Sequence, residues 1–288
     1  MKKLIFCVGI FLVSTGLALA QHSSDISRQV TSQMLNHTRS TDAPKEAVFS
    51  IKLQIRTHFT NTSPQTDYLS YTSCSAVKID NHWLLASLAC RDTTPVTTLH
   101  DIHGNLISQT VQEHRISGIK VGSAAIDKED IFIDENSQLI LIRANEANTS
   151  LLDELADSES VADLLITNDP RTILDTLKQT YLNRQRQIVG GRRVVEVAIQ
   201  QYDIGTKCYW VKRSIFDGKA GDPLFVSLEG FPGVKFLAGL NSAPISWGEI
   251  QTGQEYRALD SQAYAFIRNT VSTHDAAAWQ RIAKHVNS

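Results

Sequence analysis

Residues 74–90 read Cys-Ser-Ala-Val-Lys-Ile-Asp-Asn-His-Trp-Leu-Leu-Ala-Ser-Leu-Ala-Cys, and this stretch says more about the fold than any other. Two apolar, strand-like runs, Ser75–Ile79 and Trp83–Ala86, flank a turn signal at Asp80-Asn81, which predicts a β-hairpin. A hairpin brings its two ends together, so Cys74 and Cys90 form the natural disulfide pair. Close Cys-x-x-Cys spacing, which structural zinc usually shows, is absent from the sequence, and no metal site or other cofactor is expected.

Short β-rich runs of the same kind recur along the chain between turn residues, and many short strands predict an all-β barrel or sandwich. The further runs are Val48–Ile55, Ser117–Val121, Ile131–Ile133, Leu139–Ile142, Val194–Gln200, Leu224–Val226 and Val234–Leu240. An acidic stretch, residues 146–163, separates two β-rich halves and carries leucines at helical spacing, so part of it is predicted to be helical.

Two helices are expected to close the chain. Ser261 is predicted to cap a helix over Ala263–Arg268. A second helix is predicted from four residues that would share one face, Trp279, Ile282, Ala283 and Val286.

The composition indicates a globular protein without a dominant charge. The 288 residues include 28 Lys and Arg against 30 Asp and Glu, and 42% are hydrophobic, which argues against a disordered or collagen-like chain. A formal net charge of -2 provides no overall field to attract nucleic acid or an anionic membrane. We therefore expect no nucleic-acid partner.

The first residues resemble a targeting segment. Lys2 and Lys3 precede an apolar run over residues 4–19, and Ala18-Leu19-Ala20 provides small residues for cleavage. Residues 1–20 are predicted to be a signal peptide cleaved after Ala20, which makes the mature protein periplasmic or secreted, with no stable membrane insertion. Residues 21–46 are predicted to be a polar, mobile lead-in.

Three segments together resemble the trypsin-like serine proteases, and the resemblance covers about Ala47–Arg268. Residues 74–90 look like C-S-G-V-L-I-D-x-x-W-V-L-T-A-A-H-C, residues 136–143 like N-D-I-A-L-I-K, and residues 218–225 like G-D-S-G-G-P-L-F. The resemblance implies two antiparallel β-barrels in a domain over 47–268, the first over about 47–145 and the second over about 165–260. Residues 269–288 would then form a C-terminal helical extension.

The chemistry departs from that family. Its histidine takes a proton from its serine, and its aspartate orients the histidine. The matching positions here are Ala89, Gln138 and Ala220, separated by 49 and 82 residues, and none of these side chains can perform its role. Asp130, followed by Ile131, is a second candidate for the aspartate position.

Other positions of the resembled site are also altered. Lys219 stands where the family has the acid that pairs with a new amino terminus after activation. The Ile188–Gly191 segment is interpreted as a turn, not an activation site. The resemblance implies a vestigial oxyanion hole at Gly218 and Ala220, and a vestigial pocket near Ser214 and Ser242, with Ser246–Gly248 as the alternative register for the pocket rim.

Three further features are interpreted as structural. Cys208 is predicted to be a buried free thiol, with an intermolecular bridge as the alternative. His100 and His103 are predicted to be solvated loop residues. A basic cluster is predicted to be an exposed turn, with binding of an acidic partner or a phosphate group as the alternative. It consists of Arg184, Arg186, Arg192 and Arg193.

The favoured function is that of a pseudoprotease, a protein-binding or regulatory module whose protein partner the sequence does not identify. An active hydrolase with a nucleophile at Ser87, Ser214 or Ser242 is the first alternative. A structural subunit of an envelope assembly, with residues 21–46 as a docking arm, is the second.

Overall fold

The structure of the chain is a computed structural model, and it describes part of the 288 residues. The described residues are 46–59, 67–91, 96–100, 102–104, 106–157, 160–167, 185–189, 193–197, 199–212, 219–227, 234–247 and 250–287. The predicted signal peptide and all of the lead-in except Glu46 lie outside them. Within these residues, no helix has both the length and the apolar character needed to cross a membrane.

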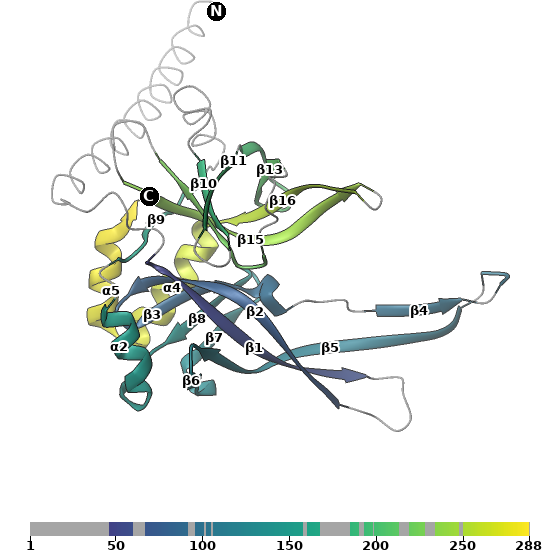
Figure 1. Cartoon of the computed structure of the whole chain (residues 1–288), viewed down its shortest axis with the longest axis horizontal. Helices are drawn as coiled ribbons and strands as arrows, with labels where there is room; N and C mark the ends of the chain where they lie inside the picture. The colour runs from purple at the N-terminus through teal and green to yellow at the C-terminus, as the bar shows by residue number, and fades with distance from the viewer. Residues whose placement is uncertain are drawn as a thin grey trace, which may run out of the picture.

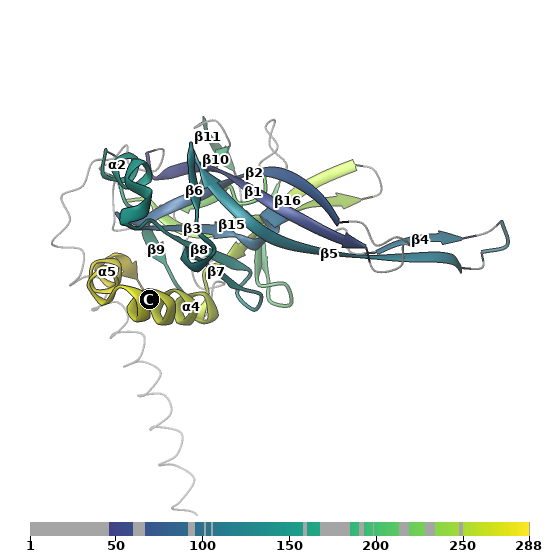
Figure 2. The same cartoon turned by 90° about the horizontal axis from the view of Figure 1, so that it is seen from below.

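Among the described residues, the first sheet has eight strands, all paired antiparallel, and occupies the lower half of Figure 1. Its strands in spatial order are β4 (Val96–His100), β5 (Leu106–Val121), β1 (Val48–Phe59), β2 (Asp67–Asp80), β3 (Trp83–Ser87), β8 (Leu139–Arg143) and β7 (Ile131–Asp134), with β6 (Ala124–Ile126) paired to β5. The distal part of β5 pairs with β4 alone, and this two-stranded arm projects from the body (Figures 1 and 2).

The second sheet has nine strands in the part of the chain that the structure describes, and it lies above the first in Figure 1. Its antiparallel strands in spatial order are β11 (Arg193–Val197), β10 (Gln185–Val189), β14 (Pro223–Val226), β15 (Phe236–Trp247), β16 (Ile250–Ala258), β13 (Cys208–Lys212) and β12 (Ile199–Asp203). Two short strands extend it in parallel, β9 (Asp163–Leu165) beside β15 and β17 (Val286–Asn287) beside β9. Two curled, mainly antiparallel sheets with few helices confirm the predicted all-β, two-barrel fold class.

The described helices lie toward one end of the molecule (Figure 2). They are α2 (Thr149–Asp157), α4 (Ser261–His274) and α5 (Ala276–Ile282), and the short 3-10 turns are η2 (Leu88–Arg91), η3 (Lys128–Asp130), η4 (Glu146–Asn148) and η5 (Ala283–His285). In Figure 2 α2 is separated from α4 and α5. Helix α2 confirms that part of the acidic stretch is helical. The Arg281 guanidinium ties α5 to the first sheet, because Nε and Nη2 donate to the two carboxylate oxygens of Asp80 at 2.8 and 2.9 Å.

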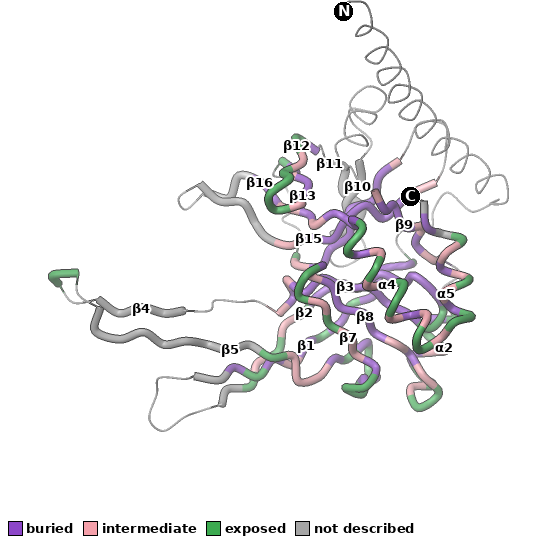
Figure 3. The backbone as a smooth tube through the Cα atoms, turned by 180° about the vertical axis from the view of Figure 1, so that it is seen from behind, coloured by how far each residue is buried: buried purple, intermediate pink, exposed green. Residues whose placement is uncertain are grey.

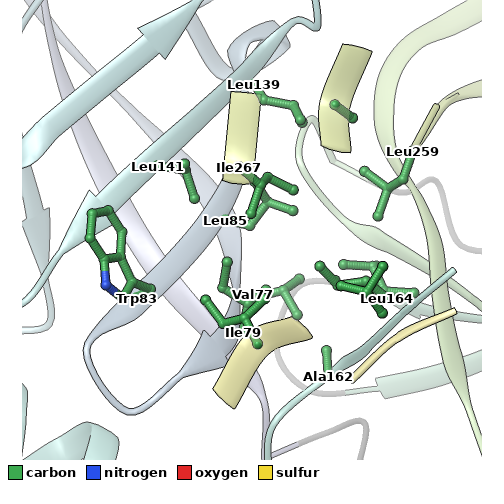
Figure 4. Packing of buried hydrophobic residues seen from close by; sticks show 14 of the residues in the cluster. Val77, Ile79, Trp83, Leu85, Leu139, Leu141, Ala162, Leu164, Leu259 and Ile267 are labelled. Atoms are coloured by element: carbon green, nitrogen blue, oxygen red, sulfur yellow. The ribbon is translucent and has the colours of Figure 1, made fainter. Parts of the chain in front are cut away.

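The buried apolar residues form three clusters, one inside each curled sheet and one between the sheets and helices α4 and α5. Strands β3 and β8 serve two of these clusters at once: Leu85 and Leu141 face the shared cluster, whereas Leu84 and Ile140 face the interior of the first sheet. Figure 4 shows Leu85 packed close to Ile267 of α4. Burial on both faces explains why these strands read as continuous apolar runs rather than alternating ones.

Strand β1 of the first sheet follows a different pattern. In Figure 3 β3 and β8 are buried along nearly their whole length, whereas β1 alternates between buried and exposed residues. Ile51, Leu53 and Ile55 of β1 point into the core, and Lys52 and Arg56 between them are exposed. One face of β1 therefore meets solvent, as in an antiparallel sheet that packs on one side only.

Several local predictions are wrong. The sequence predicts one strand over Val194–Gln200, but β11 ends at Val197 and β12 begins at Ile199, and the two strands lie at opposite edges of the sheet. Ile188 and Val189 belong to β10 and not to a turn, while Gly190 and Gly191 lie outside the described residues. The sequence pattern does not reveal these points because residues 194–200 read as one continuous β-rich run, although β11 pairs with β10 and β12 pairs with β13.

The predicted helix ends also differ. Asp260, not Ser261, caps α4, because its Oδ1 accepts the N–H groups of Gln262 and Ala263 at 3.0 Å each, and α4 runs on to His274. Helix α5 ends at Ile282, and Val286 lies in strand β17 beside β9 instead of on a helix face. The domain boundaries drawn from the sequence stay predictions.

Candidate functional site

A disulfide anchors the candidate site. Cys74 on β2 and Cys90 in η2 are bonded, with their Cα atoms 5.8 Å apart, which confirms the predicted pair. The hairpin of β2 and β3 brings the two cysteines together, as the sequence indicated. Both sulfur-bearing residues are buried in the core of the first sheet.

The turn at residues 219–222, which enters β14 of the second sheet, sits directly on this disulfide. Cys74 Sγ lies 3.1 Å from the carbonyl oxygen of Ala220. Gly221 has φ +83°, and a Cβ added there would lie 2.4 Å from Cys74 Sγ and 2.8 Å from Cys90 Sγ. Only glycine fits, since both the positive φ and the close approach exclude a side chain.

Asp222 fixes the shape of this turn. Its buried carboxylate accepts a hydrogen bond from Ser75 Oγ at 2.6 Å through Oδ1 and one from the Lys219 N–H at 2.7 Å through Oδ2. Backbone bonds to Asn241 of β15 hold it on both sides: Gly221 N–H donates to Asn241 O at 2.9 Å, and Asn241 N–H donates to Asp222 O at 2.8 Å. The bond from Ser75 on β2 to Asp222 joins the two sheets.

Sequence reasoning missed Asp222 and Ser75. The available indication was that Asp222 stands where the resembled segment has a glycine, three residues after Lys219 replaces the acid of that segment. In the structure the Asp222 carboxylate accepts hydrogen bonds from within the fold, from Ser75 and the Lys219 N–H.

Gln138 lies beside the segment that carries Ala89. Its carbonyl oxygen accepts the Leu88 N–H at 2.9 Å, and its backbone has a positive φ of 59°. The Gln138 carboxamide turns back onto its own loop, where Nε2 donates to the Glu135 carbonyl at 2.5 Å. Arg91 binds the side chain of the same glutamate, because its guanidinium donates to both Glu135 carboxylate oxygens at 2.6 and 3.2 Å.

The three candidate triad positions thus converge around η2. Ala89 follows Leu88 and precedes Cys90, its N–H donating to Ser87 Oγ at 3.2 Å. Ala220 packs against the core cluster that contains both disulfide cysteines. The three positions therefore lie on segments that are distant in sequence and contact one another, through the Leu88–Gln138 bond, the disulfide and the Cys74–Ala220 contact. Two of the positions carry a methyl group and one an amide, and none of these side chains can take up a proton or act as a nucleophile.

Asp130 lies elsewhere. Its buried carboxylate accepts hydrogen bonds from Arg143 Nε at 2.6 Å and from Asn145 Nδ2. Arg143 ends β8, whereas Leu139, next to Gln138, begins it, and this length of strand spans about 13 Å. Of the two candidates for the aspartate position, Gln138 is the one beside Ala89, although the assignment of that role to it stays a prediction.

The structure describes only part of the predicted oxyanion hole and pocket. Gly218 of the oxyanion hole, Ser214 of the pocket and Gly248 of the alternative rim lie outside the described residues. Ser242 Oγ donates to the Glu255 carbonyl at 3.2 Å and lies 3.7 Å from Cys208 Sγ. Cys208 is a buried free thiol, and burial raises its pKa. The Ser242 hydroxyl is therefore engaged by its own sheet.

The other motifs are incompletely placed. His103 is exposed, whereas the His100 side chain and those of the predicted basic cluster lie outside the described residues. Across the part of the chain that the structure describes, no three His, Cys, Asp or Glu side chains are grouped to hold a metal ion.

Comparison with known proteins gives similarity in structure only. No family profile matches the sequence, and no curated protein is similar to it. A thermostable serine protease, AL20, from an extremophilic microorganism is similar at 12% identity over 82% of this chain and 100% of its own, with a TM-score of 0.43. The protease Anisep from Arthrobacter nicotinovorans is similar at 9% identity over 79% and 100%, with a TM-score of 0.42.

Proposed function

We propose that this chain is a catalytically inactive protein of the trypsin-like type, which acts outside the cytoplasm by binding another protein. The observation that carries the proposal is the convergence of Ala89, Gln138 and Ala220 beside the disulfide. Acyl transfer by the mechanism of the resembled family needs a nucleophile, a base and a group that orients the base. Two of these positions carry only a methyl group.

The geometry of the turn supports the same proposal. In the resembled family an acid next to the serine pairs with a freed amino terminus, whereas Lys219 at that position would repel one. The buried Asp222 carboxylate holds the turn through Ser75 and the Lys219 N–H instead. A turn that is held in this way needs no activation cleavage, which agrees with a function based on binding.

The alternative nucleophiles are engaged by the backbone. Ser87 is buried and its Oγ accepts the Ala89 N–H, while the Ser242 hydroxyl donates to the Glu255 carbonyl. Neither hydrogen bond would raise the nucleophilicity of a serine oxygen in the way that a histidine base does. The third alternative, Ser214, lies outside the described residues.

The test is covalent labelling with a fluorophosphonate probe together with assays on peptide esters and casein. We expect no labelling and no hydrolysis by the purified protein. The double variant Ala89→His with Ala220→Ser should remain nearly inactive, since Gln138 cannot orient the new histidine. Labelling of the natural protein that disappears on Ser87→Ala, Ser214→Ala or Ser242→Ala would establish a hydrolase and refute the proposal.

A further inference from the structure

The outer face of β1 and β5 places like charges directly opposite each other. The register pairs Lys52 with Lys120 and Arg56 with Arg115, and all four residues are exposed. Side chains opposite each other in antiparallel strands have Cβ atoms about 4.5–5.5 Å apart, and like charges in that position are destabilising. Packing does not require these charges, because the opposite face of β1 alone supplies its core residues.

A row of three paired residues, Tyr71, Gln54 and Gly118, crosses the sheet between the two charge pairs. Gln54 is paired with Tyr71 of β2 on one side and with Gly118 of β5 on the other. Its Nε2 donates to the Tyr71 hydroxyl at 3.1 Å, and its Oε1 would lie 3.1 Å from a Cβ added at Gly118. The Gln54 side chain therefore lies across the sheet from β5 to β2.

Two apolar side chains border the charges. Tyr71 is 63% exposed and Leu69 is 44% exposed, and Leu69 is paired with Arg56. Tyrosine and arginine are enriched in protein interfaces, where a large side chain combines apolar area with hydrogen bonding. We define the cationic face as Lys52, Arg56, Arg115, Lys120, Leu69 and Tyr71.

We propose that the cationic face binds an extended acidic segment of a partner protein. Lys52 and Arg56 are four residues apart on one strand, about 13 Å along its axis. Same-face residues of an extended segment recur at every second position, so its carboxylates can meet both charge pairs. Between the two charge pairs, Gln54 and Tyr71 present polar atoms to the bound segment.

The net charge of the chain favours a short protein segment over a larger polyanion. Nucleic acid and an anionic bilayer extend beyond the cationic face, so they would also meet the rest of a chain whose formal net charge is -2. A short segment contacts the cationic face alone, since charges beyond about 8 Å are screened at physiological salt. The proposal goes beyond the proposed function, which assigns no binding surface, and does not depend on the absence of catalysis.

The experiment uses a fluorescein-labelled peptide of about nine residues that alternates glutamate and threonine, with a glutamine and threonine peptide as its control. Fluorescence anisotropy at low salt should show binding of the acidic peptide only, and weaker binding as salt is added. The double variant Lys52→Gln with Lys120→Gln should weaken binding at least about tenfold. Tyr71→Ser should weaken it about threefold or more.

Lys212→Gln with Lys284→Gln is the matched control, because it removes two exposed lysines elsewhere on the surface. It should change the affinity less than about twofold, as expected for charges that do not contact the peptide. Equal weakening by both double variants would overturn the proposal, as would failure of the acidic peptide to bind. Cooperative thermal unfolding of each variant, at a melting temperature no lower than that of the natural protein, establishes that folded proteins are compared.

Two further probes test the class of partner. Tighter binding of oligothymidylate, or of vesicles containing equal phosphatidylglycerol and phosphatidylcholine, with loss in the Lys52→Gln and Lys120→Gln variant, would overturn the assignment to an acidic protein. The outcomes are distinguishable from those of the labelling test. Loss of peptide binding leaves the absence of hydrolysis unaffected, and a labelled serine leaves the peptide result unaffected.

Discussion

The 219–222 turn and the cationic face treat charge in opposite ways. Asp222 is fully buried, and its carboxylate accepts hydrogen bonds from Ser75 and Lys219 within the fold. On the cationic face, Lys52 and Lys120 are exposed and placed opposite each other. A buried charge must be satisfied internally or the fold is destabilised, whereas an exposed charge is solvated and tolerates an unfavourable neighbour at small cost.

The difference separates a structural role from a binding role. Asp222 holds the turn and joins the two sheets, so we expect its removal mainly to lower the free energy of unfolding. The opposed lysines reduce stability slightly, so we expect their removal mainly to weaken binding of the acidic segment. Binding surfaces commonly reduce stability in this way, because selection for a partner competes with selection for the isolated fold.

The largest expected effect is on the buried carboxylate. Asp222→Ala leaves the Ser75 hydroxyl without its acceptor and removes the bond to the Lys219 N–H, so we expect a loss of about 2–4 kcal/mol in unfolding free energy. At this size the loss corresponds to a fall of about 5–12 °C in Tm, measured by calorimetry.

Asp203→Ala is the control for this prediction. The exposed Asp203 accepts the Gly205 N–H at 2.7 Å, so it also supports a turn, but in water. The control should cost less than about 1 kcal/mol. Equal losses of unfolding free energy in the two variants would show that a buried turn aspartate stabilises the fold no more than an exposed one. That result would contradict the contrast between the 219–222 turn and the cationic face.

A buried carboxylate at the start of helix α4, that of Asp260, should give an intermediate effect, visible through pH. Burial alone would raise the pKa of Asp260, but the Ala263 N–H and Lys207 outweigh it and hold the pKa below its usual value. A lowered folded-state pKa contributes stability above about pH 4, the unfolded value, and that contribution is lost as pH falls through the folded value.

Asp260→Asn should therefore reduce the fall in Tm between neutral pH and about pH 3, with a cost at neutral pH of about 0.5–1 kcal/mol. Asp153→Asn, at an exposed position of α2, provides the control. If the pH dependence of the Asp260 variant matches that of the natural protein, the carboxylate does not contribute to the acid sensitivity of the fold.

The smallest expected effect is a gain on the cationic face. Lys52→Glu converts a like-charge pair with Lys120 into an opposite-charge pair, which should stabilise the protein by about 0.2–1 kcal/mol. The gain should appear as a small rise in Tm at low salt and decrease at high salt. Lys212→Glu, on a strand opposite Gly253, should give no gain, and a decrease in Tm for Lys52→Glu would contradict the repulsion.

Much of the fold was accessible from the sequence because its strongest signals are local. The apolar runs of Trp83–Ala86 and Leu139–Ile142 are so continuous that they predict strands without knowledge of the partners, and the hairpin between Cys74 and Cys90 is closed by a nearby turn. Strands such as β13 and β16 were missed, since their apolar pattern is weaker and the pairing between them joins segments about 45 residues apart in sequence.

The candidate site divides in the same way. Residue type at Ala89, Gln138 and Ala220 is fixed by the sequence, and with it the absence of a base and a nucleophile from those positions. Their proximity is decided by tertiary structure, because the Leu88–Gln138 bond, the disulfide and the Cys74–Ala220 contact join segments far apart in the chain.

The same physical reason explains the roles of Asp222 and Lys52. A sequence determines which charges and methyl groups are present, and from local periodicity it indicates which face of a strand is apolar. Whether a carboxylate is buried against a serine from another sheet, or a lysine stands opposite a second lysine, depends on strand register. Register is set by packing across the whole sheet, so only the tertiary structure decided it.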